Sequence, residues 1–268
     1  MKILNPRIAV IMPWGGQSID FLRRAMISVD QQTYKNLEKI LICDGFSVNE
    51  EIKKQFPDWM YLKNSTDIRG PASTRNLAFE SLAHEIEYIL LADADDISHP
   101  NRAEKLLTQI AQSQIDILGS QGVIIDTRKN HGKNRIYPYP NMVNINTIIE
   151  NKLKNGQNAF LAPSVLMKRE VIEIIGLYDV TLLRGEDLDY FQRACTFGFK
   201  LGNSDDFLYG YRTAFWTPIR NFKKDWQWSG RRMPLLPAYL LHIGRRFSVF
   251  MNPMRVKRVK SIWNCHVS

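Results

Sequence analysis

The chain has 268 residues, of which 44% are hydrophobic and 24% charged, and its formal net charge is +9. This length and composition are ordinary for a folded protein with one large α/β domain or two small ones. No apolar run approaches the roughly 18 residues of a membrane-spanning helix, and Asn5, Pro6 and Arg7 interrupt the apolar core that a signal peptide requires, so we expect neither.

The spacing of the cysteines and histidines argues against a zinc enzyme. The three cysteines, Cys43, Cys195 and Cys265, are far apart, and neither they nor the five scattered histidines have metal-ligand spacing. An odd number of scattered cysteines is typical of reduced thiols. We therefore expect a cytoplasmic protein.

The first 115 residues alternate between apolar strand patterns and helical patterns. Strands are predicted near 7–12, 39–43, 60–62 and 88–92, and helices near 19–31, 49–56, 72–82 and 101–112. This alternation predicts an α/β fold with a mostly parallel central sheet and helices on both faces.

The second part of the chain is less regular. We expect residues 117–126 to form a strand pair or one long bent strand and residues 127–139 to form a basic mobile loop. A strand is predicted at 162–167, and helices are predicted at 169–175 and 187–197. We predict a domain over 1–215, with a regular half of about 1–115 and a less regular half of about 116–215. A separate basic tail, 216–268, follows it.

Three carboxylates, Asp93, Asp95 and Asp96, directly follow the apolar strand at 88–92. Ligands bind at this end of the strands in an open α/β sheet. Three like charges so close repel one another, and Mg²⁺ or Mn²⁺ bridging to a phosphate would neutralise them. The alternatives are a turn or helix-capping cluster, or a phosphatase of the haloacid dehalogenase type with Asp93 as the nucleophile.

Three other groups of residues each have two interpretations. Asp44 is followed by Gly45, so it binds a nucleobase or ribose or merely forms a turn. Arg69 and Arg75 flank a helix start that suits a phosphate or a solvated first turn. Glu186 and Asp187 begin a helix, where they supply a general base or cap the helix.

The order of these motifs resembles the inverting family 2 glycosyltransferases, which have the GT-A (Rossmann-like) fold, and the resemblance spans roughly residues 7–212. The matching motifs are Val10-Ile11-Met12-Pro13, Ser28 to Tyr34, Asp44 to Ser47, Gly70 to Asn76, Ala92 to Pro100, Ser164 to Asp179, and Glu186-Asp187 with Arg193. Two positions depart from the family: Phe46 replaces its usual Gly, and Thr213-Ala214 follows Tyr211-Arg212 where many members have a His.

The resemblance implies that the half of about 1–115 is the nucleotide-binding half and that the half of about 116–215 is the acceptor half. It also implies a role for each matching position. Asp44 would bind the uracil of a UDP-sugar, with Pro13 and Trp14 lining the base pocket. Arg75 would lie near the nucleotide, Asp93 would contact ribose or metal, and Asp95 would ligate a divalent Mn or Mg ion. Asp187 would be the general base of a single in-line displacement that inverts the sugar, and Glu186 and Arg69 are possible accessory residues.

The implied reaction moves a hexose or N-acetylhexosamine to a hydroxyl of a growing, lipid-linked surface glycan such as lipopolysaccharide or capsule. A non-catalytic, basic-tailed protein that binds anions is the non-enzyme alternative.

The excess positive charge lies in the tail. Residues 220–268 hold eleven of the 36 basic residues but one of the 27 acidic ones. A basic, apolar and aromatic tail predicts docking to an anionic membrane surface, which would make the protein peripheral at the inner face of the cell membrane. A helix packed on the domain and a nucleic-acid groove are the alternatives. The family's lipid-linked acceptors favour the membrane.

Overall fold

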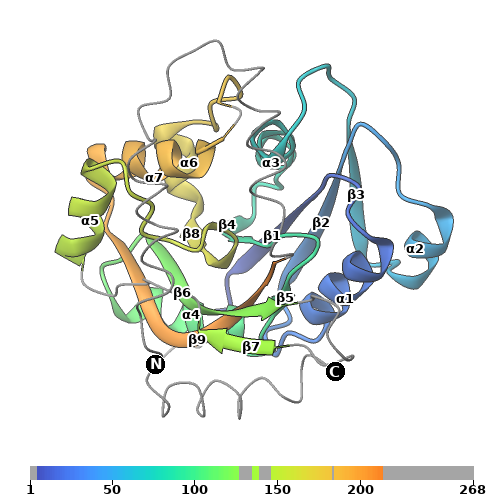
Figure 1. Ribbon diagram of the computed structural model, residues 1–268, viewed down its shortest axis with the longest axis horizontal. Coiled ribbons are helices and arrows are strands. Elements are labelled where there is room, and N and C mark those ends of the chain that lie inside the picture. The colour runs from blue at the N-terminus through green and yellow to red at the C-terminus, as the bar shows by residue number, and fades with distance from the viewer. Residues whose placement is uncertain (1–4, 127–134, 139–145, 183, 214–268) are drawn as a thin grey trace.

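A computed structural model describes residues 5–126, 135–138, 146–182 and 184–213. Their strands form one nine-stranded sheet in the order β3-β2-β1-β4-β8-β6-β9-β5, with β7 paired to β6 (Figure 1). The strands are β1 Arg7–Trp14, β2 Leu37–Asp44, β3 Trp59–Asn64, β4 Ile86–Leu91, β5 Ile97–Ser98, β6 Ile117–Asp126, β7 Arg135–Pro138, β8 Leu166–Lys168 and β9 Leu201–Thr213. The helices are α1 Ile19–Asp30, α2 Glu50–Gln55, α3 Pro71–Glu80, α4 Arg102–Gln112, α5 Asn146–Lys154, α6 Arg169–Ile175 and α7 Glu186–Thr196.

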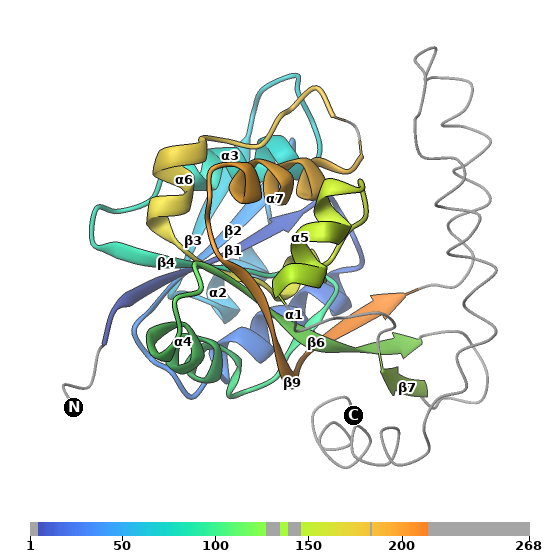
Figure 2. The ribbon, with the colours of Figure 1, turned by 90° about the vertical axis from the view of Figure 1, so that its left-hand side faces the viewer.

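The central strands are apolar on both faces because helices cover both sides of the sheet. In β1, Ile8, Val10 and Met12 pack in one buried cluster, and Ala9 and Ile11 pack in the other. Residues of α1, α2 and α4 complete the first cluster, and residues of α3, α5, α6 and α7 complete the second. Figure 2 shows the two helix layers on opposite sides of the sheet. The predicted α/β fold class is confirmed.

The two halves of the sheet differ in strand direction. Strands β3, β2, β1 and β4 are parallel, as predicted. Beyond β4 the sheet is mixed, since β8 is antiparallel to both β4 and β6, while β9 is parallel to β6. The carboxyl ends of β1, β2 and β4 therefore meet at one edge, and the mixed half closes around it.

The second half also departs from the expected elements. Residues 162–167 begin with a 3₁₀ turn, Ala162–Ser164, before the short strand β8, because Pro163 has no N–H for a strand ladder. The stretch 117–126 is a single strand with register shifts near Gln121, which fits the predicted long bent strand. Helix α5 and strands β5, β7 and β9 were not predicted, and β7 falls inside the predicted loop 127–139.

The predicted basic tail, 216–268, and the rest of the 127–139 loop lie outside the described residues. Within the described ranges, each helix is too short or too polar to cross a membrane.

Candidate active site

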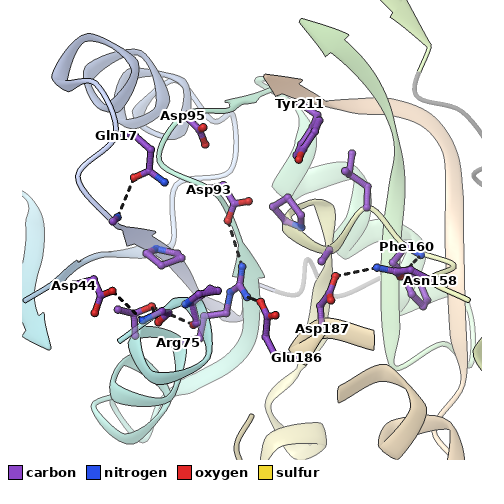
Figure 3. A pocket seen from close by; sticks show the side chains of 18 residues that line it. Gln17, Asp44, Arg75, Asp93, Asp95, Asn158, Phe160, Glu186, Asp187 and Tyr211 are labelled. Carbon is purple, nitrogen blue, oxygen red and sulfur yellow. Dashed lines mark hydrogen bonds and ion pairs between the residues drawn. The ribbon is translucent and has the colours of Figure 1, made fainter. Parts of the chain in front are cut away.

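A pocket of about 390 Å³ opens where the carboxyl ends of β1, β2 and β4 face the start of α7 (Figure 3). Its lining residues come from both halves of the chain and are Pro13, Gly15, Gln17, Asp44, Gly70, Pro71, Thr74, Arg75, Asp93, Asp95, Asn158, Phe160, Leu161, Ala162, Pro163, Glu186, Asp187 and Tyr211. Six of the sequence-predicted site residues with polar side chains are thereby brought together: Asp44, Arg75, Asp93, Asp95, Glu186 and Asp187.

Arg75 joins the two sides of the pocket. It lies on α3, is 5% exposed, and its guanidinium is 3.4 Å from Asp93 Oδ1 and 3.2 Å from Glu186 Oε1. Burial alone would lower the pKa of Arg75, but Tyr178 and the nearby carboxylates outweigh it and raise the pKa above its ordinary value. The guanidinium is therefore kept charged, and it contacts Glu186, which is 111 positions away in the chain.

The three aspartates after β4 do not share one role. Asp93 and Asp95 line the pocket, whereas Asp96 is 2% exposed and accepts a hydrogen bond from the backbone N–H of Arg212. Burial, followed by repulsion from neighbouring aspartates, raises the pKa of Asp95 and Asp96. Burial also raises the pKa of Asp93 against the opposing effect of Arg75.

Asp93 and Asp95 fit a divalent cation whose other ligands are phosphate oxygens and water. Asp93 and Asp95 are half-buried carboxylates with raised pKa values, and a hard cation would stabilise their charged forms. Across the described part of the chain, no group of three or more His, Cys, Asp or Glu side chains could hold a metal by itself. The protein would therefore supply Asp93 and Asp95, and a bound diphosphate and water would supply the rest.

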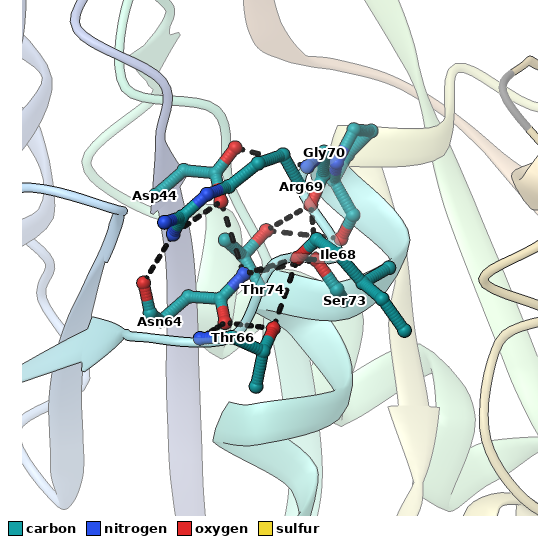
Figure 4. A network of polar contacts seen from close by, with 9 residues as sticks. Asp44, Asn64, Thr66, Ile68, Arg69, Gly70, Ser73 and Thr74 are labelled. Carbon is teal, nitrogen blue, oxygen red and sulfur yellow. Dashed lines mark hydrogen bonds and ion pairs between the residues drawn. The ribbon is translucent and has the colours of Figure 1, made fainter.

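Asp44 belongs to a polar network at the end of β2 (Figure 4). Its Oδ1 accepts a hydrogen bond from Asn64 Nδ2 at 3.0 Å, and its Oδ2 accepts one from the backbone N–H of Gly70 at 2.9 Å. Arg69 lies against Gly45, where an added Cβ would be 2.5 Å from the Arg69 Nη1 atom. Asp44 is thus more than a turn residue, because it ties β2 to the start of α3. Arg69 braces this network and is not among the lining residues.

The structure separates the two predicted base-pocket residues of β1. Pro13 lines the pocket, while Trp14 is 7% exposed and packs edge-on against Phe46 at 4.8 Å between ring centroids. Successive side chains of a strand point to opposite sides, so Trp14 lies behind the pocket wall. Gln17 instead reaches the pocket from the loop that follows.

Glu186 and Asp187 lie at the start of α7, which begins after Gly185 in a left-handed conformation with φ of 77°. Burial raises the pKa of Glu186 against the opposing effect of Arg75. Asp187 Oδ1 accepts its neighbour's backbone N–H, that of Leu188, at 2.9 Å, and Asp187 Oδ2 accepts a hydrogen bond from Asn158 Nδ2 at 2.9 Å. A carboxylate held this way at the pocket wall can accept a proton from a bound hydroxyl.

A second arginine, Arg102, was not predicted from the sequence. It lies under the pocket and connects two segments of the pocket wall. It is completely buried, and it donates hydrogen bonds to the carbonyl oxygens of Leu91 at 2.5 Å and Pro163 at 2.7 Å. Burial lowers its pKa to about 10, which leaves it charged at neutral pH. Arg102 thereby fixes the end of β4, and hence the following aspartates, to the segment that forms the opposite wall. Asn158 and Tyr211 were also missed as pocket residues: Asn158 falls in no recognised motif, and Tyr211 was noted only where the chain departs from the family pattern.

The chain is similar to known glycosyltransferases in sequence and in fold. Residues 10–176 match Glycosyl transferase family 2. A glycosyltransferase of Methanocaldococcus jannaschii, MJ1057, is 27% identical over 215 residues, which are 78% of this chain and 71% of that protein. The Escherichia coli O-antigen biosynthesis glycosyltransferase WbnJ is 28% identical over 152 residues, 54% of this chain and 57% of that protein.

The fold is also that of S. aureus TarS. The structure of TarS 1-349 with UDP-GlcNAc superposes with a TM-score of 0.61 at 16% identity, over 77% of this chain and 58% of that one. The chain thus spans less than two thirds of WbnJ and of this TarS fragment. Since the family match covers more than half of its length, the chain belongs to glycosyl transferase family 2 and is a glycosyltransferase with the GT-A fold.

Proposed function

We propose that this enzyme transfers a hexose or N-acetylhexosamine from a UDP-sugar to a hydroxyl of a glycan, with inversion and with the help of a divalent metal. The observation that carries the proposal is that one pocket has Asp44, Asp93 and Asp95 on the side of the parallel strands and Asp187 on the side of α7 (Figure 3). The strand side would bind the nucleotide of the donor, and the α7 side would bind the attacking hydroxyl of the acceptor.

The donor side suits a uridine diphosphate. A carboxylate such as Asp44 accepts a hydrogen bond from the imide N–H of uracil, and its own contacts to Asn64 and Gly70 keep it in place. Structures of TarS 1-349, which has the same fold, were solved with UDP and with UDP-GlcNAc. This likeness supports a UDP-sugar as the donor here.

Asp93 and Asp95 are the residues that would hold Mn²⁺ or Mg²⁺. The bound ion would offset the negative charge that develops on the departing diphosphate. Arg75 contacts Asp93 at Oδ1, with its Nη2 3.4 Å away, and this leaves Asp93 Oδ2 for a ligand.

Asp187 is the proposed general base. As the acceptor oxygen forms its bond to the anomeric carbon, the bond from that carbon to UDP breaks on the opposite face, and the hydroxyl proton passes to Asp187. One displacement of this kind inverts the anomeric configuration. The competing phosphatase hypothesis would make Asp93 the nucleophile, but the family match and the Arg75–Asp93 contact favour the transferase.

For the acceptor, we extend the proposal to a lipid-linked surface glycan. The E. coli relative is named for O-antigen biosynthesis, which supports this class of acceptor. The basic residues of 216–268 would dock the enzyme to an anionic membrane surface. Vesicle sedimentation with and without an anionic lipid, on the full chain and on a chain ending at 215, tests this part.

Isothermal calorimetry tests the donor and the metal together. UDP, GDP, CDP and ADP are titrated into the wild type and Asp95→Asn, with and without Mn²⁺, and Asp67→Asn on the exposed surface is the matched control. We expect Mn²⁺-dependent binding of UDP that Asp95→Asn weakens at least about tenfold. Preference for GDP would overturn the donor, and equal binding in Asp95→Asn would overturn the metal site.

A further inference from the structure

Asn158 is a polar residue in the pocket wall that belongs to none of the recognised motifs. Its side-chain amide makes two hydrogen bonds: Nδ2 donates to Asp187 Oδ2 at 2.9 Å, and Oδ1 accepts from the backbone N–H of Phe160 at 3.0 Å. The second bond defines which end of the amide is which, because only the oxygen can accept from an N–H. The NH₂ group is therefore the end that faces Asp187 (Figure 3).

The backbone around Asn158 is anchored to the sheet. Asn203 of β9 is 6% exposed and donates a hydrogen bond from Nδ2 to the carbonyl oxygen of Ala159 at 3.0 Å. Asn203 and Phe160 pack tightly over Gly119 of β6, where an added Cβ would be 2.3 Å from Asn203 Oδ1 and 2.9 Å from the Phe160 ring. This segment is thus held by the core, not by the amide of Asn158.

The same segment also packs on the helix that carries Asp187. The Phe160 ring lies 4.7 Å from the ring of Phe191 on α7, measured between centroids, and both rings are buried. The distance between Asn158 and Asp187 is therefore set by packing on both sides of the hydrogen bond.

If Asn158 were absent, one hydrogen bond would still hold one oxygen of Asp187. Its Oδ1 accepts the Leu188 N–H at the helix start, but a single bond leaves the carboxylate able to rotate about that contact. The bond from Asn158 fixes the second oxygen and hence the plane of the carboxylate. Proton transfer depends steeply on such orientation.

We propose that Asn158 is a positioning residue that orients the carboxylate of Asp187 for proton abstraction. This inference rests on the proposed role of Asp187 as the general base. This role of Asn158 differs from helix capping. The Leu188 N–H at the start of α7 is already bonded to Asp187 Oδ1, and Asn158 donates its amide to Asp187 from a separate, anchored segment.

The test uses the full chain with Mn²⁺ and follows UDP release from UDP-GlcNAc, UDP-glucose and UDP-galactose, with water as the acceptor. Asn158→Ala should lower kcat roughly 10- to 100-fold, the value of a hydrogen bond to a charged group, and leave the donor KM and the UDP Kd within about twofold. Asn155→Ala is the matched control, because Asn155 is exposed nearby and its amide donates a hydrogen bond to the carbonyl oxygen of Asn151 at 2.8 Å, away from Asp187.

Two further variants separate positioning from a structural effect. In Asp187→Asn/Asn158→Ala, UDP release should equal that of Asp187→Asn alone, since the amide acts only through Asp187. In Asn158→Asp, a second carboxylate faces Asp187, so the pair retains a proton and the acidic limb of the pH–rate profile should move up by about one unit or more. Arg75, Asp93 and Glu186, the charged groups near Asp187, are unchanged in both variants.

The outcomes distinguish the inference from the function on which it rests. If Asp187→Asn keeps wild-type UDP release, the proposed general base is wrong. If Asp187→Asn is inactive but Asn158→Ala keeps a kcat within twofold of the wild type, only the inference is overturned. An additional loss in the double variant, or an unshifted acidic limb in Asn158→Asp, overturns it as well.

Discussion

The two sides of the pocket are constructed by different means. On the donor side, the sheet places Asp44 at the end of β2 and Asp93 just after β4. Asp44 accepts hydrogen bonds from Asn64 Nδ2 and the Gly70 N–H, and the N–H of Asp93 donates to Tyr209 Oη. On the acceptor side, Glu186 and Asp187 lie at a helix start and are held by the side chains of Arg75 and Asn158.

Because of this difference, we expect that nucleotide binding and turnover can be changed separately. Changes on the acceptor side should alter turnover with little effect on nucleotide binding, because no strand end moves. Arg75 is the exception, since its guanidinium contacts both Asp93 and Glu186.

Arg75→Leu should affect both sides and the stability of the fold. Removing one partner of a buried ion-pair network leaves Asp93 and Glu186 uncompensated, which costs about 3 kcal/mol or more in the free energy of unfolding. Urea unfolding measures this loss. Arg23→Leu is the control, because its contacts to Asp20 and Glu51 are on the surface and contribute about 1 kcal/mol or less. Equal stability of the two variants would show that Arg75 does not join the two sides.

Asp96→Asn should make the metal-free protein less sensitive to pH. Burial and the charges of Asp93 and Asp95 raise the pKa of Asp96 well above its ordinary value, whereas in the unfolded chain it stays near about 3.9. Above that value the folded state holds a proton that the unfolded state has lost, so stability falls as the pH rises toward the folded-state pKa. Asn has no such proton and keeps an acceptor for the Arg212 N–H.

Urea unfolding at pH 5, 6.5 and 8 measures this effect. The advantage of Asp96→Asn over the wild type should grow with pH and reach about 1 kcal/mol or more, the equivalent of one pKa unit. Asp67→Asn on the exposed surface is the control. An advantage that shrinks as the pH rises would contradict the assigned environment of Asp96.

Arg69→Ala should have the smallest effect. Arg69 braces the donor side from outside the pocket, with its Nη1 3.9 Å from Asp44 Oδ1 and its side chain 44% exposed. Asp44 keeps its bonds to Asn64 and Gly70, so the UDP Kd should rise no more than about fivefold, as for an exposed ion pair. A much larger rise would mean that Arg69 contacts the nucleotide itself.

The donor side was largely predictable from the sequence. Its elements alternate regularly, and an apolar strand ending in Asp93-Ala94-Asp95 carries both its fold and its chemistry in adjacent residues. The assignment of Trp14 to the base pocket was less secure, because only one of two successive strand residues can face the pocket. The pattern at Pro13 and Trp14 does not say which one does.

The acceptor side was harder to predict because long-range contacts determine it. Strand β9 contains Gly202, Asn203, Asp205 and Asp206, residue types that are depleted in strands. Gly202 and Asn203 nevertheless pair with β6, and Asp205 and Asp206 lie where the register of that pairing shifts. Helix α5 did have a local signal, the buried pair Ile149 and Leu153 at helical spacing. Asn158 had none, since its partner Asp187 is 29 residues away.

The most direct test of the account compares binding with turnover in Asp187→Asn. UDP titration by calorimetry with Mn²⁺ and UDP release from a UDP-sugar are measured on the same preparation. We expect a UDP Kd within about twofold of the wild type and a kcat lower by about 100-fold or more, the contribution of a general base. Wild-type turnover in Asp187→Asn, or a loss of UDP binding equal to the loss of turnover, would contradict the division of the pocket into a donor side and an acceptor side.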